Sequence, residues 1–495
     1  MKYFNQNLIK NFVILLFFIS GFVLQAQSAK SYSKEVEAKI KKVENNLSGW
    51  LQIKDKPQKW TLNERMKFYN TNGVSIAVIK NYKIEWAKGY GWMDSLRQKP
   101  VTTETLFQAG SNSKSLNAIG VLKLVQDGKL NLNADINDYL KTWKFPYDSL
   151  SKGKKITIGN LLSHTAGLSV HGFYGYENGE KTPNLTQILN GQKPANSEAV
   201  RSIFEPSLKY EYSGGGTTIC QLIIQDVTRK SYDEYMSENV LKPLNMTNSF
   251  FAQPPPVEKQ NLLATGFYND GKSVKGKYRI YPEQAAAGLW TNPIDLAKYV
   301  IETQLALKGK SKKVLSEEMT KLRLTPYIDS QAALGVFIKN KNGVKNFEHG
   351  GVIEGYVSEY VGTLEGGNGV VVMANTYNTA FLYEIIGSVA SIYDWNNTYT
   401  PEIKQEIIVE DKNLQTFLGK YTCGDNIYSI IKKSDGIYLN IIKNDYFGSG
   451  MWKIHFSDNT NFFVAETKAN FKFVQDISSK IIGFNWNEDL VKKEE

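Results

Sequence analysis

The sequence predicts a mixed α/β protein: an antiparallel sheet flanked by helices, with an inserted helical subdomain and a small C-terminal β-barrel. Strand patterns rich in β-branched residues occur early, at 73–89, and return late, at 333–374. The segment between them, 156–308, is mainly helical in pattern, whereas short alternating strands follow Pro401. A single sheet built from both ends of this region, with helices packed on it, accounts for that order.

The individual elements are expected from local patterns. Residues 73–80 and 83–89 read as two strands joined by a turn at Asn81-Tyr82. Residues 111–128 place apolar side chains at helical spacing and stop at Asp127-Gly128. Later helices are expected at 217–228, 292–307 and 380–393, later sheet strands at 333–339, 356–364 and 369–374, and barrel strands at 428–432, 436–441 and 462–465.

The N-terminus is expected to be a secretory signal peptide. Lys2 and Lys10 precede an apolar run, 12–24, which closes on an A-x-A-like site ending at Ala26. The run is shorter than the ~20 residues that span a bilayer, so we expect cleavage near Ala26 and a secreted or periplasmic protein of a bacterial envelope; an N-terminal anchor is the alternative. The predicted parts are 1–26 (signal peptide), 27–60 (helix and linker), 61–398 (main domain) and 399–495 (C-terminal β domain).

Composition excludes several function classes. The 495 residues are 42% hydrophobic and 22% charged, which is typical of a folded globular protein. The net charge is +10, but the basic residues are scattered and mixed with acids, so nucleic acid is not an expected partner. With only Cys220 and Cys423, a disulfide framework and a multi-cysteine metal site are excluded, and both side chains are expected to pack as small hydrophobes. No metal or organic cofactor is predicted.

The first chemical signal is the pair Ser111 and Lys114. Their i, i+3 spacing at a helix start puts a hydroxyl and an amine on one face. Burial and the helix dipole would both favour the neutral amine, which could then accept the serine proton. The competing interpretation is a serine that caps the helix beside an exposed lysine.

Two further segments become candidate parts of an active site when they are considered together with Ser111 and Lys114. Tyr212 follows Tyr210 and precedes three glycines and a helix, which suits a tyrosine that points into a cleft. His349 precedes Gly350 and Gly351, expected at a strand end where glycine lets a substrate approach backbone N–H groups. Each segment alone could be structural.

In this order, the three segments resemble the serine β-lactamase and penicillin-binding protein superfamily, in its class C-like branch of D,D-peptidases, D-aminopeptidases and esterases. The resemblance covers roughly 60–395 and is supported by four further stretches: 122–130, 158–168, 242–246 and 287–296. The strands past Pro401 and the sequence Gly-Lys-Tyr421 resemble the lipocalin-like barrel often appended to this branch.

The resemblance implies a role for each residue. Ser111 would be the acylated nucleophile, Lys114 its proton acceptor, and Tyr212 the acid/base that protonates the leaving group and helps activate water. His349 would replace the lysine of the K-T-G motif, and the N–H groups of Ser111 and Val352, after Gly351, would form the oxyanion hole. His164, in the stretch S-H-T-A-G-L, would be structural and lie away from the chemistry.

The sequence departs from the family pattern twice. Gly214 stands where Y-x-N has asparagine, so the amide that would contact a substrate amide is missing. With His349 in place of the family's lysine, the permanent cation that would pair with a substrate carboxylate is absent, and neutral His349 offers one donor. Both departures favour ester or peptide substrates without that carboxylate over efficient β-lactam hydrolysis.

The expected function is hydrolysis of an amide or ester through an acyl-Ser111 intermediate. The substrate class comprises β-lactams, D-alanyl cell-wall peptides and small acyl esters, and the loops around the pocket decide among them. The alternatives are a non-catalytic, penicillin-binding-like sensor or envelope binding protein with the same fold, and a structural envelope protein whose β domain is the working part. The sequence contains no G-x-S-x-G, H-E-x-x-H or P-loop motif, which argues against other hydrolases, zinc enzymes and ATP enzymes.

Overall fold

The computed structural model describes residues 32–341, 343–395, 399, 401–443 and 450–494, in two compact units, 1–40 and 41–495. The predicted signal peptide, 1–26, lies outside these residues. In the first unit a helix begins, α2 (Lys34–Glu44). Within the described ranges, no helix is both long and apolar enough to cross a membrane.

A six-stranded antiparallel sheet forms the centre of the larger unit. Its strand order is β3-β2-β11-β10-β9-β8, so early and late parts of the chain meet where β2 pairs with β11. Asn81 and Tyr82, which join β2 to β3, both have positive φ, as the favoured two-residue hairpin turn requires. The strands are β2 (Gly73–Lys80), β3 (Lys83–Gly91), β8 (Phe337–Lys341), β9 (Val344–Ile353), β10 (Tyr356–Thr363) and β11 (Gly369–Ala374).

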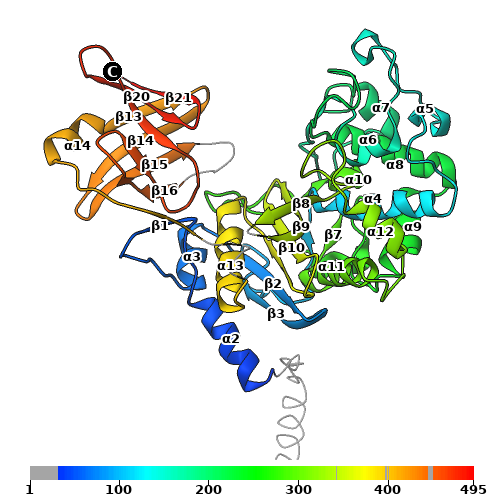
Figure 1. Cartoon of the computed structure of the whole chain (residues 1–495), viewed down its shortest axis with the longest axis horizontal. Coiled ribbons are helices and arrows are strands. Elements are labelled where there is room, and N and C mark those ends of the chain that lie inside the picture. The colour runs from blue at the N-terminus through cyan, green and yellow to red at the C-terminus, as the bar shows by residue number, and fades with distance from the viewer. Residues whose placement is uncertain (1–31, 342, 396–398, 400, 444–449, 495) are drawn as a thin grey trace, which may run out of the picture. The chain divides into compact units, whose positions relative to one another are not determined.

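Helices cover both faces of this sheet (Figure 1). On one face, the ring of Tyr360 in β10 contacts Tyr299 of α11 (Pro293–Leu307), with centroids 5.2 Å apart. The neighbouring Glu359 points to the other face. There it raises the pKa of Tyr383 in α13 (Thr379–Ile392). Strands β2, β10 and β11 are consequently buried along almost their whole length.

The helical segments between the early and late strands pack into the same core as the sheet, because one buried cluster includes Leu116, Ile223, Leu241 and Tyr360. These helices are α4 (Asn112–Gln126), α5 (Ile136–Tyr139), α6 (Ile158–Leu162), α7 (Leu185–Asn190), α8 (Gly214–Thr228), α9 (Tyr232–Met236), α10 (Gln284–Ala287) and α12 (Glu317–Arg323). Short strand pairs join β4 (Phe107–Gln108) to β7 (Trp290–Thr291) and β5 (Tyr176–Glu177) to β6 (Arg279–Ile280).

The C-terminal strands form a nine-stranded antiparallel sheet that curls into a nearly closed barrel. Aromatic side chains fill its core, including the stacked rings of Phe417 and Phe473, whose centroids lie 4.0 Å apart. The strands are β13 (Gly419–Cys423), β14 (Asn426–Lys433), β15 (Gly436–Lys443), β16 (Gly450–Lys453), β17 (His455–Phe456), β18 (Asn461–Phe463), β19 (Phe471–Gln475), β20 (Ile481–Trp486) and β21 (Asp489–Lys493).

Three local expectations are corrected. The strand expected at 333–339 begins only at Phe337, because the chain turns at Gly335, where φ is +75°. His349 lies inside the ten-residue strand β9 rather than at a strand end. Helix α8 begins at Gly214, since the Ser213 hydroxyl accepts a hydrogen bond from the Gly216 N–H at 3.0 Å, so the glycines form its first turn.

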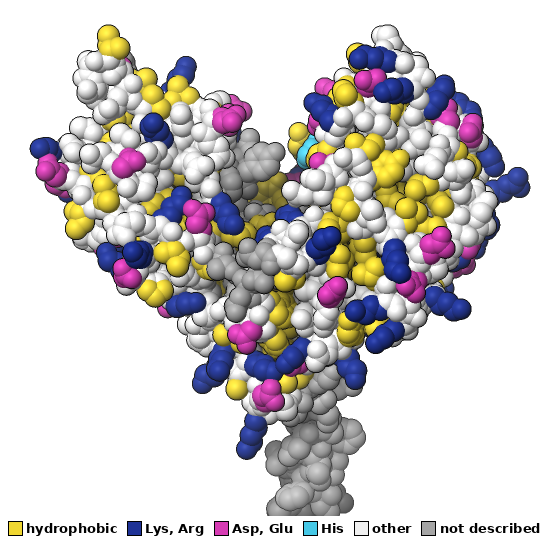
Figure 2. Space-filling view, viewed as in Figure 1, with side chains coloured by type: hydrophobic (Ala, Val, Ile, Leu, Met, Phe, Trp, Pro, Cys, Tyr) yellow, Lys and Arg dark blue, Asp and Glu magenta, His cyan; other side chains and the backbone are white. Residues whose placement is uncertain are grey.

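Cationic side chains do not gather into one patch on the face shown in Figure 2, where Lys and Arg are interspersed with Asp and Glu. Of the two cysteines, Cys220 is buried in the main core. Cys423 is partly buried against the barrel core, and both thiols are free.

Candidate active site

Ser111 lies at the start of α4, and its hydroxyl does not cap the helix. Its φ and ψ are −64° and −11°, and its side chain makes no capping hydrogen bond, which removes the interpretation of Ser111 as a helix cap. The preceding Gly110 has φ +53°, a left-handed conformation that favours glycine. The Ser113 hydroxyl donates to the Gly110 carbonyl at 2.6 Å and so holds this turn.

Lys114 is buried beside Ser111. Its Nζ lies 3.1 Å from Ser111 Oγ and 2.8 Å from the carbonyl oxygen of Ala286 in α10, and the side chain is 4% exposed. Burial lowers the pKa of Lys114 to about 7. A large fraction of this amine is therefore neutral near physiological pH and able to accept a proton.

Tyr212 lies against the same pair. Lys114 Nζ is 5.0 Å from the centroid of its ring. Burial raises the pKa of the Tyr212 phenol, while a hydrogen bond with Ser111 acts in the opposite direction. A phenol that stays protonated can donate a proton to a leaving group, so the acid half of its expected role fits this environment better than the base half.

His349 is buried and neutral. Burial, followed by the charge of Lys114, lowers its pKa to about 3. Its Nδ1 lies 2.7 Å from the Gly350 carbonyl oxygen, which can only accept, so Nδ1 carries the hydrogen and Nε2 is an acceptor. The one donor expected of neutral His349 is therefore used by the Gly350 carbonyl and is not left for a substrate.

The part of β9 that has no partner in β8 lies against residues 109–111, called here the serine turn. Strand β8 pairs with β9 only from Val344 to Glu348, which leaves the edge from His349 onward open toward that turn. A Cβ added at Gly351 would lie 2.0 Å from the Ala109 carbonyl oxygen, and one added at Gly110 would lie 3.3 Å from the Val352 nitrogen. The backbones around Ser111 and Val352 are therefore in close contact, as an oxyanion pair requires. Because Gly351 has no side chain, the backbone carbonyl of Ala109 can pack against it.

Two histidines that the sequence did not assign to the site lie against Tyr212. The ring of His164 is 4.3 Å from that of Tyr212, and the ring of His171 is 4.8 Å away, measured between centroids. The expectation that His164 lies away from the chemistry is therefore wrong. Its Nδ1 accepts a hydrogen bond from the Ser213 N–H at 3.2 Å, so His164 supports the backbone beside Tyr212. No sequence pattern indicates this position, because the φ of +57° at His164 and its contact with Tyr212 are visible only in the structure.

The described residues hold no group of three or more His, Cys, Asp or Glu side chains arranged to bind a metal ion. What the site brings together is a serine, a buried lysine, a protonated tyrosine and the closely approaching backbones of Gly110 and Val352. That set can perform acyl transfer to and from a hydroxyl.

The fold and site define a class that includes serine hydrolases and penicillin-binding proteins. Residues 61–386, more than half of the chain, match the family model described as Beta-lactamase, and the chain belongs to that family.

The relatives agree with this assignment. The chain is 28% identical to Protein flp of Staphylococcus aureus (strain N315) over 61% of this chain and 59% of that protein, so it matches only about three fifths of that relative's length. It is 25% identical to the putative penicillin-binding protein PbpX of Bacillus subtilis (strain 168), over 73% of this chain and 83% of that protein. The structure of the octameric penicillin-binding protein homologue from Pyrococcus abyssi has the same fold, with a TM-score of 0.61, 21% identity, and coverage of 87% of this chain and 97% of that one.

Proposed function

We propose that this protein is an exported serine hydrolase that transfers an acyl group from an ester or amide to water through an acyl-Ser111 intermediate. The observation that carries the proposal is the 3.1 Å separation of Lys114 Nζ from Ser111 Oγ in a buried site. An uncharged amine within hydrogen-bond reach is what a serine needs to become a nucleophile. The relative named as a putative penicillin-binding protein supports the same chemistry.

The chemical steps follow from the positions of the groups. Lys114 accepts the Ser111 proton as Oγ bonds to the substrate carbonyl carbon, and the oxyanion is held by the N–H groups of Ser111 and Val352. The bond to the leaving group then breaks, and that group takes a proton from the Lys114 ammonium, or from Tyr212, whose phenolate is then reprotonated by that ammonium. Neutral Lys114 next takes a proton from water as the water oxygen bonds to the acyl carbon. The bond to Ser111 Oγ breaks and the Lys114 ammonium returns a proton to Oγ, which releases the acid and regenerates the serine.

The substrate class follows from the two departures at Gly214 and His349. The acceptor nitrogen of His349 cannot pair with a substrate carboxylate in the way that a lysine would. Small acyl esters and carboxylate-free amides are therefore preferred to β-lactams and D-alanyl peptides with a free carboxylate.

The nucleophile is tested by mapping a covalent adduct. Wild type and Ser111→Ala are incubated with a fluorophosphonate, a fluorescent penicillin and p-nitrophenyl acetate, and adducts are located by intact mass and peptide fragmentation. We expect a fluorophosphonate adduct on Ser111 and ester turnover in wild type, with both absent in Ser111→Ala. Equal labelling of both proteins would show that the assignment is wrong. A wild type that acylates without turnover would favour the penicillin-binding-like sensor.

Hydrolysis is expected to depend on pH through Lys114. Its neutral form is the base, so with a pKa of about 7 the value of kcat/KM should rise up to that pH and then level off. Below the midpoint the rate should fall about tenfold per pH unit, since the neutral fraction of Lys114 shrinks by that factor. A stopped-flow profile of p-nitrophenyl acetate hydrolysis from pH 5 to 10 measures this. A flat profile across pH 6 to 8 would contradict the assignment of Lys114 as base.

A further inference from the structure

The space beside Gly214 is already occupied. A Cβ added at Gly214 would lie 3.0 Å from the His171 carbonyl oxygen and 3.1 Å from Cε2 of the Phe173 ring. Both distances are shorter than ordinary van der Waals contact, so a larger side chain could not enter without displacing this loop. Where the family pattern has an asparagine amide, this protein has the segment 169–174, called here the aromatic loop.

The aromatic loop is attached to the first turn of α8 by three successive carbonyl groups. The Ser169 carbonyl accepts from the Ser213 hydroxyl at 2.7 Å, and the carbonyls of Val170 and His171 accept from the N–H groups of Gly215 and Gly214, each at 3.0 Å. Val170 has φ +63°, a strained conformation for a β-branched residue that persists only where the surroundings enforce it. The backbone, and not the Phe173 side chain, therefore fixes the path of the loop.

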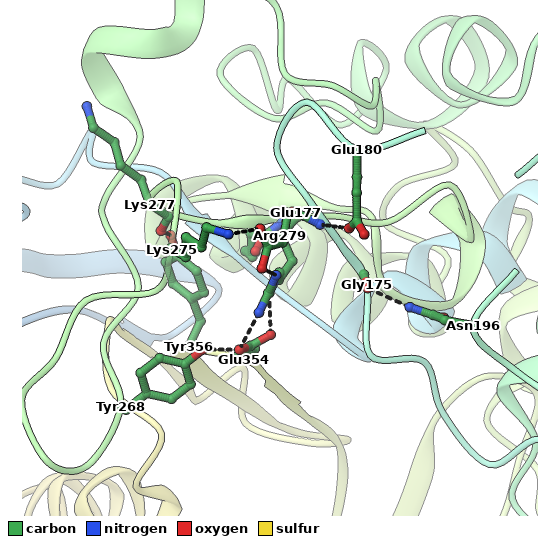
Figure 3. Close-up of polar contacts among 11 residues, drawn as sticks. Gly175, Glu177, Glu180, Asn196, Tyr268, Lys275, Lys277, Arg279, Glu354 and Tyr356 are labelled. Carbon is green, nitrogen blue, oxygen red and sulfur yellow. Dashed lines mark hydrogen bonds and ion pairs between the residues drawn. The ribbon is translucent and has the colours of Figure 1, made fainter. Parts of the chain in front are cut away.

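The far end of the loop is also fixed, as Figure 3 shows. The Gly175 carbonyl accepts from the Asn196 amide at 2.8 Å, and Glu177 pairs with Arg279 at 3.2 Å. Arg279 in turn makes two bonds to Glu354, at 2.5 and 3.0 Å. Glu354 directly follows β9, so Arg279 links the aromatic loop to the strand that carries His349 and Val352.

The loop therefore presents aromatic side chains beside the reacting groups. The exposed ring of His171 lies against Tyr212, and the half-buried ring of Phe173 lies over Gly214. The phenyl ring of Phe173 offers apolar contact area but cannot form the hydrogen bonds of a side-chain amide. Gly214 and the Phe173 ring above it thus present apolar surface beside Tyr212 where the family pattern presents an amide.

We propose that Phe173, held over Gly214 by the aromatic loop, forms an apolar subsite that selects substrates with alkyl or aryl acyl groups. This specificity rests on the proposed acyl-Ser111 chemistry. Acyl groups that carry an amide side chain are disfavoured, because the amide would lose its hydrogen bonds to water without finding a partner at Gly214.

The test compares acyl groups at constant leaving group. The p-nitrophenyl esters of acetate, hexanoate and phenylacetate are hydrolysed by wild type, Phe173→Ala and Phe173→Leu, with thermal melting as the folding control. Phe173→Ala should lower kcat/KM about tenfold for hexanoate and phenylacetate and leave acetate within about twofold, a discrimination typical of apolar pockets. Phe173→Leu, which keeps an apolar side chain, should retain the hexanoate preference of wild type.

The outcomes separate this inference from the proposed function. If wild type hydrolyses all three esters but Phe173→Ala leaves their ratios unchanged, the apolar subsite is wrong and the serine hydrolase remains. If no ester acylates Ser111 in wild type, both are overturned. If Phe173→Ala does not fold, the test uses the ratios of kcat/KM for hexanoate and phenylacetate to that for acetate in wild type and Phe173→Leu. A wild type that shows no preference for the larger acyl groups would show that the proposed apolar subsite is wrong.

Discussion

Replacing Lys114 by methionine is expected to lower kcat/KM by about 10³-fold, the range that removal of a positioned general base produces. Methionine has a similar length and no charge, so it fits the buried site without leaving an ionised group in it. The Ala286 carbonyl loses its lysine donor, at a cost of about 1–3 kcal/mol. The variant no longer has the cost of burying an amine away from water, which offsets the lost hydrogen bond, so we expect a melting temperature close to that of wild type.

Two measurements distinguish a base from a structural lysine. The residual activity of Lys114→Met should no longer rise with a midpoint near pH 7, because the group that titrates there is absent. Lys123→Met is the matched control, since Lys123 lies on the same helix in a partly exposed i, i+4 pair with Asp127. That variant should keep wild-type activity. Retention of more than about a tenth of the wild-type activity by Lys114→Met would exclude it as the base.

The fold could be predicted because its signals are local. The hairpin of β2 and β3, the late strands and the barrel strands each follow from alternation and turn residues within a few positions. The contact between Ser111 and Lys114 is equally local, since a spacing of three on a helix brings side chains together wherever the helix lies. The structure contains these elements close to the predicted positions, except that the strand expected at 333–339 begins only at Phe337.

The surroundings of Tyr212 could not be predicted, because they depend on long-range contacts. His164 and His171 reach its ring only because the chain at 169–171 is hydrogen-bonded to the first turn of α8. No periodic pattern encodes that contact. The sequence predicts the missing amide at Gly214, and the structure adds that the Phe173 ring lies where a side chain at that position would begin.

The tautomer of His349 could not be predicted from the sequence either. The sequence alone leaves either ring nitrogen free to donate. The choice is made by the Gly350 carbonyl, 2.7 Å from Nδ1, which depends on the backbone conformation of β9. A conclusion about the charge and donors of a site therefore needs the coordinates even when every site residue is known from a motif.

Gly351→Ala is expected to lower kcat by about 10²–10³-fold, the loss measured when one oxyanion donor is removed. The new Cβ would lie 2.0 Å from the Ala109 carbonyl oxygen and 2.6 Å from Ser358 Oγ. A backbone carbonyl held between β4 and α4 cannot rotate away, so β9 must move from the serine turn. That movement separates the N–H groups of Ser111 and Val352, and the oxyanion loses one of its two donors.

Gly350→Ala is the control on the same strand. Its Cβ would meet Oε2 of Glu359 at 2.6 Å, the end of a side chain that can rotate, on the opposite face from Ala109. We expect this variant to lose stability but to retain kcat within about threefold, since the oxyanion pair stays in place. Thermal melting and the hydrolysis of p-nitrophenyl acetate measure the two effects separately. If Gly351→Ala retained wild-type kcat, the N–H groups of Ser111 and Val352 would not form the oxyanion hole, because their spacing cannot survive the added methyl group.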